Sequence, residues 1–235
     1  MVGLLILHGF TGSLDTVRAL VPLAEKLGLP YRMPVLRGHG TQYMDLADVK
    51  AQDWYDDAEH AMFDLLSEVD EVIIIGLSMG GVLALNLAIQ HANKIKGLVL
   101  LAPALRFRDP LTMFSPLLKK IFTYWKSPSS FKDKKLEREV CTNYPYFPTA
   151  AFDELRQYAK RTVRQLHEVN VPVVTLYTAK DTIVSKQIID ILRRQLATDQ
   201  KHFVKFFRSG HEMLQDCQAT EIILTIEKTL KVWIS

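Results

Sequence analysis

Several features are scarce in this chain of 235 residues, and each scarcity excludes a class of protein. Its only cysteines, Cys141 and Cys217, are too few and too far apart to indicate a disulfide framework or a metal cluster. No window reaches the roughly 18 uncharged apolar residues that span a bilayer, so we expect no stable membrane insertion. The net charge of +3 is too small to indicate nucleic-acid binding.

The apolar segment at residues 1–7 is short, and no basic region precedes it. These properties favour a buried strand over a signal peptide. Two isolated thiols are typical of proteins from a reducing compartment. We therefore expect a cytoplasmic protein, and no group of residues indicates a metal or another cofactor.

Short apolar runs alternate with segments of helical periodicity along most of the chain. Repeated strand–helix units of this kind predict a parallel sheet with helices on both faces, which is the α/β class. The expected strands are residues 3–7, 31–35, 72–75, 98–101, 171–177 and 202–206. The expected helices are residues 13–27, 53–69, 79–90, 153–167, 187–196 and 220–233.

This alternation stops between residues 104 and 170. The segment has 13 Lys or Arg residues and 7 Asp or Glu residues, whereas the rest of the chain has 16 and 19. It is also rich in aromatic residues and proline. We therefore predict a core formed by residues 1–103 and 171–235, with residues 104–170 inserted as a small cap.

The strongest chemical signal is the sequence G-x-S-x-G at residues 76–80, centred on Ser78. An apolar strand at 72–75 precedes it and an apolar helix at 79–90 follows it at once. This strand–turn–helix context is typical of a nucleophile elbow, in which a tight turn exposes the serine hydroxyl above the sheet. We therefore predict Ser78 as a nucleophile rather than as part of an ordinary glycine-rich turn.

A serine hydroxyl needs a base near neutral pH, and in this architecture the order along the chain is serine, acid, histidine. His211 follows the last expected strand, in Ser209-Gly210-His211. Asp181 follows the strand before it, where its carboxylate can orient the imidazole. We predict His211 as the base and Asp181 as its partner, although a surface histidine and a turn aspartate are the plain alternatives.

The loop at residues 8–12 follows the first expected strand and can aim a backbone N–H at the reacting oxygen. We predict that the N–H groups of Phe10 and Met79 form the oxyanion hole. His8 comes before the nucleophile, so we interpret it as a structural residue. The second loop, Arg37-Gly38-His39-Gly40, either approaches the site or merely turns the chain, and we favour the turn.

We expect the cap to contribute to the substrate site. The predicted substrate-binding residues are Phe10 in the core and Met113, Phe114 and Leu117 in the cap. The alternative is that these cap side chains only pack the cap onto the core.

Taken together, these motifs resemble the bacterial carboxylesterases and monoacylglycerol lipases of the α/β-hydrolase superfamily. Their order and approximate spacing match over nearly the whole chain, and the cap resembles the family least. The chain begins almost directly at the strand before the oxyanion loop, so a sheet of about six or seven strands is expected. The matching segments are residues 8–12, 37–40, 53–54, 76–81, the loop around Asp181 and residues 209–211.

The resemblance implies an esterase that needs no cofactor, acts on short to medium acyl esters and, in some members, on monoacylglycerols, and forms an acyl-enzyme intermediate. Two other readings stay open from the sequence. An acyltransferase or thioesterase uses the same three residues, because water, an alcohol and a thiol compete for one acyl-enzyme. A non-catalytic protein can also keep the fold as a ligand pocket.

Overall fold

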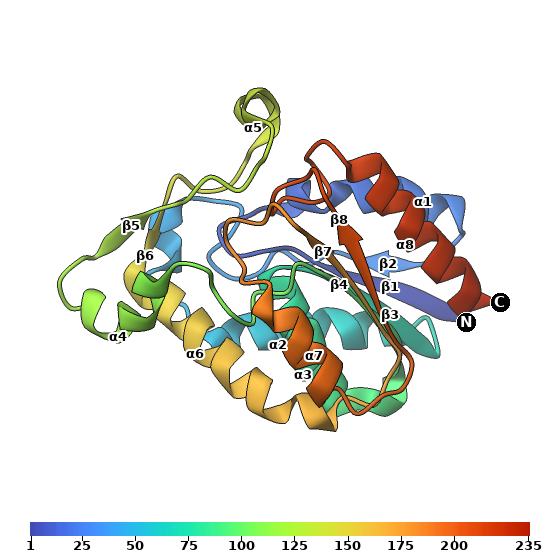
Figure 1. The fold of residues 1–235 in the computed structure, drawn as a ribbon. Coiled ribbons are helices and arrows are strands. Elements are labelled where there is room, and N and C mark those ends of the chain that lie inside the picture. Colours follow the sequence, from blue (N-terminus) through green and yellow to red (C-terminus); the bar gives the residue numbers. More distant parts are fainter.

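The computed structural model describes every residue from Met1 to Ser235. A six-stranded sheet crosses the molecule in the order β2-β1-β3-β4-β7-β8, and all neighbouring strands are parallel (Figure 1). A separate antiparallel pair is formed by β5 and β6. The strands are β1 (Val2–Leu7), β2 (Tyr31–Arg32), β3 (Glu71–Leu77), β4 (Ile95–Leu101), β5 (Tyr124–Lys126), β6 (Tyr146–Pro148), β7 (Val173–Thr178) and β8 (Lys201–Phe206).

Helices cover both faces of the large sheet, with α1 and α8 on one face and α2, α3, α6 and α7 on the other (Figure 1). This arrangement confirms the predicted α/β class. The helices are α1 (Val21–Lys26), α2 (Ala51–Leu66), α3 (Met79–His91), α4 (Ser115–Leu118), α5 (Lys134–Val140), α6 (Thr149–Gln165), α7 (Gln187–Gln195) and α8 (Ala219–Ile234). None of them is long and apolar enough to cross a membrane.

The alternation of side chains along each strand divides the core into two layers. In β1, Leu5 and Leu7 belong to the layer with α2 and α3, while Leu4 and Ile6 belong to the layer with α1 and α8. All four side chains are fully buried, and each stabilises the fold by roughly 1.5–3 kcal/mol. Burial on both faces explains why the central strands read as continuous apolar runs.

Two elements are shorter than the sequence pattern predicts, and each difference involves a proline. The expected helix at 13–27 consists of two 3-10 turns followed by α1, which begins at Val21 with Pro22 in its first turn. Proline suits a first turn and breaks a helix interior. The expected strand at 31–35 is reduced to Tyr31–Arg32, since Pro34 cannot donate to a ladder.

The segment 104–170 has two parts in the structure. The short elements α4, β5, α5 and β6 lie at one end of the molecule, above the carboxyl ends of the strands (Figure 1). Helix α6 instead packs on α2 and α3, and its Ala151, Leu155 and Ala159 are buried in the main core. The division into a core and a cap at residues 104–170 stays a prediction.

Candidate active site

Ser78 lies between β3 and α3, in the tight turn that the sequence predicts. Its φ of 54° is unusual for a residue other than glycine. The surrounding backbone holds this conformation: the Ser78 N–H donates to the Leu101 carbonyl at 2.9 Å, and the Ser78 carbonyl accepts from Ala104 at 3.1 Å. A strained backbone conformation that the surrounding hydrogen bonds hold in place is typical of functional positions.

The two glycines around Ser78 are required by close backbone approach. A Cβ on Gly76 would lie 2.3 Å from the Gly80 carbonyl oxygen, and one on Gly80 would lie 2.3 Å from the Leu7 carbonyl oxygen. Real Cβ atoms do not approach backbone oxygens this closely. A larger residue at position 76 would therefore displace the start of α3, and one at position 80 would push the serine turn away from β1.

His211 lies within hydrogen-bonding distance of both Ser78 and Asp181. The Nε2 atom of His211 is 2.9 Å from the Ser78 Oγ, and its Nδ1 atom is 2.8 Å from Asp181 Oδ2. All three residues are at least nine-tenths buried. They come from loops after β3, β7 and β8, which end at the same edge of the sheet. The structure therefore brings together the three side chains that the sequence singles out.

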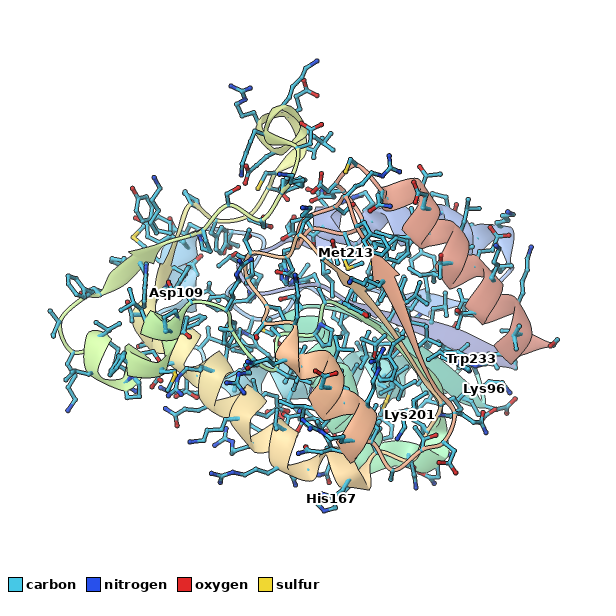
Figure 2. The ribbon with its side chains drawn as sticks, in the orientation of Figure 1. Lys96, Asp109, His167, Lys201, Met213 and Trp233 are labelled. Atoms are coloured by element: carbon cyan, nitrogen blue, oxygen red, sulfur yellow. The ribbon has the colours of Figure 1, made fainter.

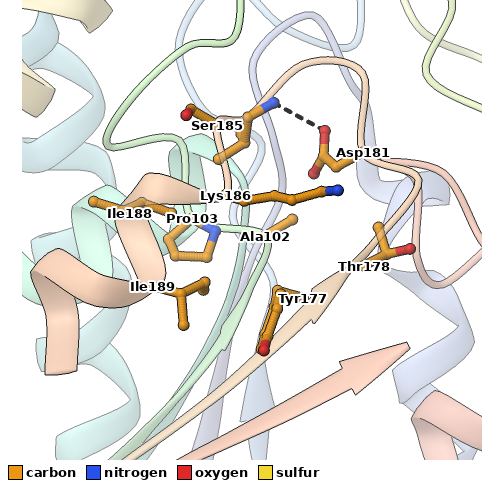
Figure 3. A pocket seen from close by; sticks show the side chains of 10 residues that line it. Ala102, Pro103, Tyr177, Thr178, Asp181, Ser185, Lys186, Ile188 and Ile189 are labelled. Carbon is orange, nitrogen blue, oxygen red and sulfur yellow. Dashed lines mark hydrogen bonds between the residues drawn. The ribbon is translucent and has the colours of Figure 1, made fainter. Parts of the chain in front are cut away.

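The Asp181 carboxylate is held from its other side by its own loop. Its Oδ1 atom accepts the backbone N–H groups of Ile183 and Val184, each at 2.8 Å, and Figure 3 shows the carboxylate beside this loop. A hollow of only about 10 Å³ lies next to it, between Ala102 and Ile188. This hollow has room for one water molecule at most and is too small for a substrate.

The ion pair between Asp181 and His211 shifts both pKa values. Burial alone would raise the pKa of Asp181, but the charge and hydrogen bond of His211, with two backbone N–H groups, lower it below 3.8. Burial alone would lower the pKa of His211, but the Asp181 carboxylate raises it above 6.5. The imidazole is therefore a stronger base than a free histidine, as a general base requires.

The loop after β1 lies directly beside the serine. A Cβ on Gly9 would be 3.3 Å from the Ser78 Cβ. The N–H of Phe10 has no acceptor within the protein, and Met79 is the first residue of α3, where N–H groups lack helical partners. Both N–H groups are thus free to donate to a ligand, and their role as an oxyanion hole stays a prediction.

Two buried histidines hold this loop in place. His8 Nε2 accepts the N–H of Leu36 at 3.1 Å, and His39 Nε2 accepts the N–H of Thr11 at 3.2 Å. Burial lowers the pKa of His8 to about 4 and that of His39 to about 3, so both are neutral acceptors at pH 7. His8 is structural, as the sequence predicts. The loop at 37–40 is more than a turn, because His39 supports the loop beside the serine.

A cavity of about 810 Å³ opens beside Ser78 and His211. Six aromatic side chains, Tyr144 among them, line it, and five of their rings pack against one another, with centroids 4.8–6.4 Å apart. Rings that pack against one another offer a continuous apolar surface, which suits an acyl chain. The five rings are those of Phe10, Phe107, Trp125, Phe147 and Phe152.

The four predicted substrate-binding residues divide into two groups. Phe10 lines the cavity. Met113, Phe114 and Leu117 do not line it, and 57–71% of each is exposed to solvent. The sequence shows that the cap contains many apolar side chains, but it does not reveal which of them point into the cavity. The inward rings of Trp125 and Phe147 come from β5 and β6.

Comparison with known proteins places this geometry in a family. Residues 3–218 match the Hydrolase_4 family, which is described as "Serine aminopeptidase, S33". The chain belongs to this family. Among curated relatives, the thermostable monoacylglycerol lipase of Bacillus sp. (strain H-257) is 28% identical over 225 residues, covering 94% of this chain and 87% of that protein. The carboxylesterase of Bacillus subtilis (strain 168) is 25% identical over 217 residues, covering 90% and 85%.

Solved structures of other proteins have the same fold as this Hydrolase_4 member. A structure reported for LipS and LipT, two metagenome-derived lipolytic enzymes, matches with a TM-score of 0.89 and 25% identity, covering 97% of this chain and 94% of that one. The monoglyceride lipase of Saccharomyces cerevisiae matches with a TM-score of 0.85 at 17% identity, covering 98% and 86%, which shows the fold alone. The predicted α/β-hydrolase fold and the resemblance to carboxylesterases and monoacylglycerol lipases are confirmed.

Sequence reasoning missed the residues that position the histidine loop of this Hydrolase_4 member. The Ser130 carbonyl accepts the His211 N–H at 2.6 Å. The buried Asp216 carboxylate accepts backbone N–H groups from Gly210 and Lys132, each at 2.6 Å, and so joins the cap to the loop. No spacing could reveal these contacts, because residues 130–132 lie about 80 positions before their partners along the chain.

Proposed function

We propose that this chain is a serine hydrolase that cleaves carboxylic esters of short to medium acyl chains, including monoacylglycerols. The observation that carries the proposal is the continuous chain of hydrogen bonds from Ser78 through His211 to Asp181 beside an aromatic cavity. The names of the Bacillus lipase and carboxylesterase support the same substrate class.

In the proposed reaction, His211 Nε2 takes the proton of Ser78 while the serine oxygen forms a bond to the ester carbonyl carbon. The negative oxygen of the intermediate accepts the N–H groups of Phe10 and Met79, which have no competing acceptor. The C–O bond to the alcohol then breaks, and His211 returns its proton to the leaving oxygen. Water repeats the two steps on the acyl-enzyme, releasing the acid and restoring the serine.

Replacement of Ser78 by alanine tests the assignment. The S78A variant should keep its circular dichroism spectrum, yet lose turnover of a nitrophenyl ester by roughly 10⁵-fold or more. It should also lose covalent labelling by an alkyl phosphonate, measured as the mass of the intact protein. Ser209, two residues before His211 in sequence, is the control, and its alanine variant should still be labelled. Labelling of the S78A variant would show that another residue is the nucleophile.

The acceptor of the acyl group decides between hydrolysis and transfer. If water is the acceptor, added alcohol or thiol should leave the free acid as the main product of turnover. A transferase would convert the same acyl-enzyme mainly into a new ester or thioester. Because the family description names aminopeptidases, an amino-acid anilide belongs in the same assay, and we expect the ester to be the better substrate.

We propose that the enzyme acts in the cytoplasm on small-molecule esters, without a nucleic-acid partner. Both cysteines are free thiols, which suits a reducing compartment.

A further inference from the structure

The aromatic cavity has in its lining a buried carboxyl group that the proposed reaction does not use. Glu212 follows His211 directly, lines the cavity and is 6% exposed. Its Oε1 atom accepts the Nδ2–H of Asn143 from the cap at 2.7 Å, whereas its Oε2 atom is buried and has no hydrogen-bond partner. Buried polar atoms are nearly always paired in proteins, so a carboxylate oxygen left unpaired beside a cavity is suited to a donor on a ligand.

Two further polar atoms of the lining are also buried and unpaired. They are Asn143 Oδ1 and Ser127 Oγ, and both residues line the cavity. The two residues come from adjacent segments of the cap, since the Ser127 N–H donates to the Pro145 carbonyl at 2.9 Å. Carboxylate and amide oxygens accept hydrogen bonds and cannot donate them. A group that pairs with Glu212 and Asn143 must therefore bring donors of its own.

The charge of Glu212 has no basic side chain beside it. The charged groups that act on it are His211 and the carboxylates of Asp181 and Asp216, and none of them is a Lys or Arg. Burial raises the pKa of Glu212, and the charge of His211 opposes this rise only in part. Lys126, the single lysine of the lining, is exposed. A buried charge without a partner is costly, so a cation that reaches Glu212 is stabilised there.

The other two carboxylates of the lining differ from Glu212. Glu137 forms an ion pair with Lys134 at 3.0 Å, and Asp109 is exposed to solvent. Asp109 lies on the cap, well apart from Met213, the residue that follows Glu212 (Figure 2). Glu212 is therefore the buried, uncompensated acid of this cavity outside the Ser78–His211–Asp181 group.

Glu212 lies where the leaving alcohol is expected. In the proposed reaction His211 returns its proton to the leaving oxygen, so the alcohol must lie against the imidazole. The five packed aromatic rings suit the acyl chain, which leaves the polar lining beside His211 for the alcohol.

We propose that Glu212 and Asn143 form a subsite for an ammonium group on the alcohol part of the ester. An N–H⁺ group supplies both the donor that Glu212 Oε2 can accept and the charge that compensates the carboxylate, whereas a neutral hydroxyl supplies only the donor. The subsite therefore favours amino-alcohol esters over neutral esters of the same shape. This inference rests on the proposed function, because it assigns the alcohol side of the same reaction.

Binding of two esters of one shape to the S78A variant, which prevents turnover, tests the proposal. Dimethylaminoethyl butyrate, which is protonated near neutral pH, carries an N–H⁺ group where isoamyl butyrate carries a C–H group. We expect the ammonium ester to have a dissociation constant roughly tenfold lower, measured by titration calorimetry. Equal dissociation constants, or tighter binding of isoamyl butyrate, would overturn the proposal.

Glu212→Gln in the same background removes the charge but keeps an oxygen that can accept the Asn143 N–H. The ratio of the two dissociation constants should then fall to roughly one. The matched control is Glu139→Gln, at an exposed residue of α5 that does not line the cavity, and it should keep the parent ratio. Two results in the Glu212 variant would contradict the subsite: an unchanged ratio, or an equal loss of affinity for neutral glycerol monobutyrate.

Turnover separates this inference from the proposed function. Because binding is measured without turnover, failure of the chain with Ser78 intact to hydrolyse either ester would contradict the proposed function and not the subsite. Where both hold, kcat/KM should favour the ammonium ester, and Glu212→Gln should abolish this preference.

Discussion

At the scale of the residue, the imidazole of His211 experiences two opposing effects. Burial favours its neutral form, whereas the Asp181 carboxylate 2.8 Å away favours its charged form. The second effect is the stronger one, so the pKa of His211 lies above 6.5. A general base must be neutral to accept a proton, so in the proposed mechanism protonation of the imidazole below this pKa removes activity.

We therefore predict that kcat/KM for a nitrophenyl ester falls as the pH is lowered, with a midpoint above 6.5. Asp181→Asn should move that midpoint to lower pH, because the charge that raises the pKa of His211 is gone. The same change should reduce kcat by roughly 10³–10⁴-fold, since the imidazole loses its orienting acceptor. A midpoint that stays in place in the variant would show that another group controls the profile.

At the scale of the element, the loops that carry Asp181 and His211 are attached to the start and middle of the cap. The Arg108 N–H donates to the Ile183 carbonyl at 2.8 Å, and the Arg108 guanidinium donates to the Asp181 carbonyl at 3.0 Å. Asp216 makes the corresponding connection for the histidine loop. The cap therefore helps to position the candidate active site as well as to cover it.

Asp216→Asn should loosen the histidine loop, because the amide places an N–H group where the carboxylate accepts backbone N–H groups. We expect a loss of roughly 2–4 kcal/mol in the free energy of unfolding, measured by urea denaturation. The value of kcat/KM should fall by roughly tenfold or more. The control is Asp190→Asn at an exposed site of α7, which should change stability by less than roughly 0.5 kcal/mol. Equal stability of the two variants would contradict this role for Asp216.

At the scale of the whole molecule, the cavity is formed where the cap meets the core. Phe147 of β6 is 7% exposed and contacts Phe10 of the core and Trp125 of the cap, with ring centroids 5.5 and 6.4 Å away. The lining of the cavity therefore depends on two parts of the chain that are distant in sequence.

Phe147→Ala should weaken the binding of longer acyl chains more than the binding of an acetyl group. We expect the ratio of kcat/KM for an octanoyl ester to that for an acetyl ester to fall by roughly tenfold. Phe63→Ala, at a half-exposed ring on α2 that does not line the cavity, is the matched control. Both variants should be checked for folding by circular dichroism. An unchanged ratio in the Phe147 variant would place the acyl site elsewhere.

The local sequence predicted the strands and helices of the sheet well, because their periodicity reflects burial on both faces. It overestimated the first helix, which begins only at Val21 beside Pro22, whereas the short second strand agrees with the limit that Pro34 sets on its length. It also predicted Ser78, Asp181 and His211, since each follows a strand end in an order that this architecture prescribes. The structure brings these three side chains together, and their catalytic roles stay a proposal.

The sequence by itself determined the fold class, the strained serine turn and the positions from which an acid and a base can reach it, because these depend on short segments and their order. Only the tertiary structure decided which cap side chains line the cavity and which face solvent. It also decided that Ser130 and Asp216 hold the histidine loop. Such contacts join residues about 80 positions apart, and their geometry is set by packing rather than by any local pattern.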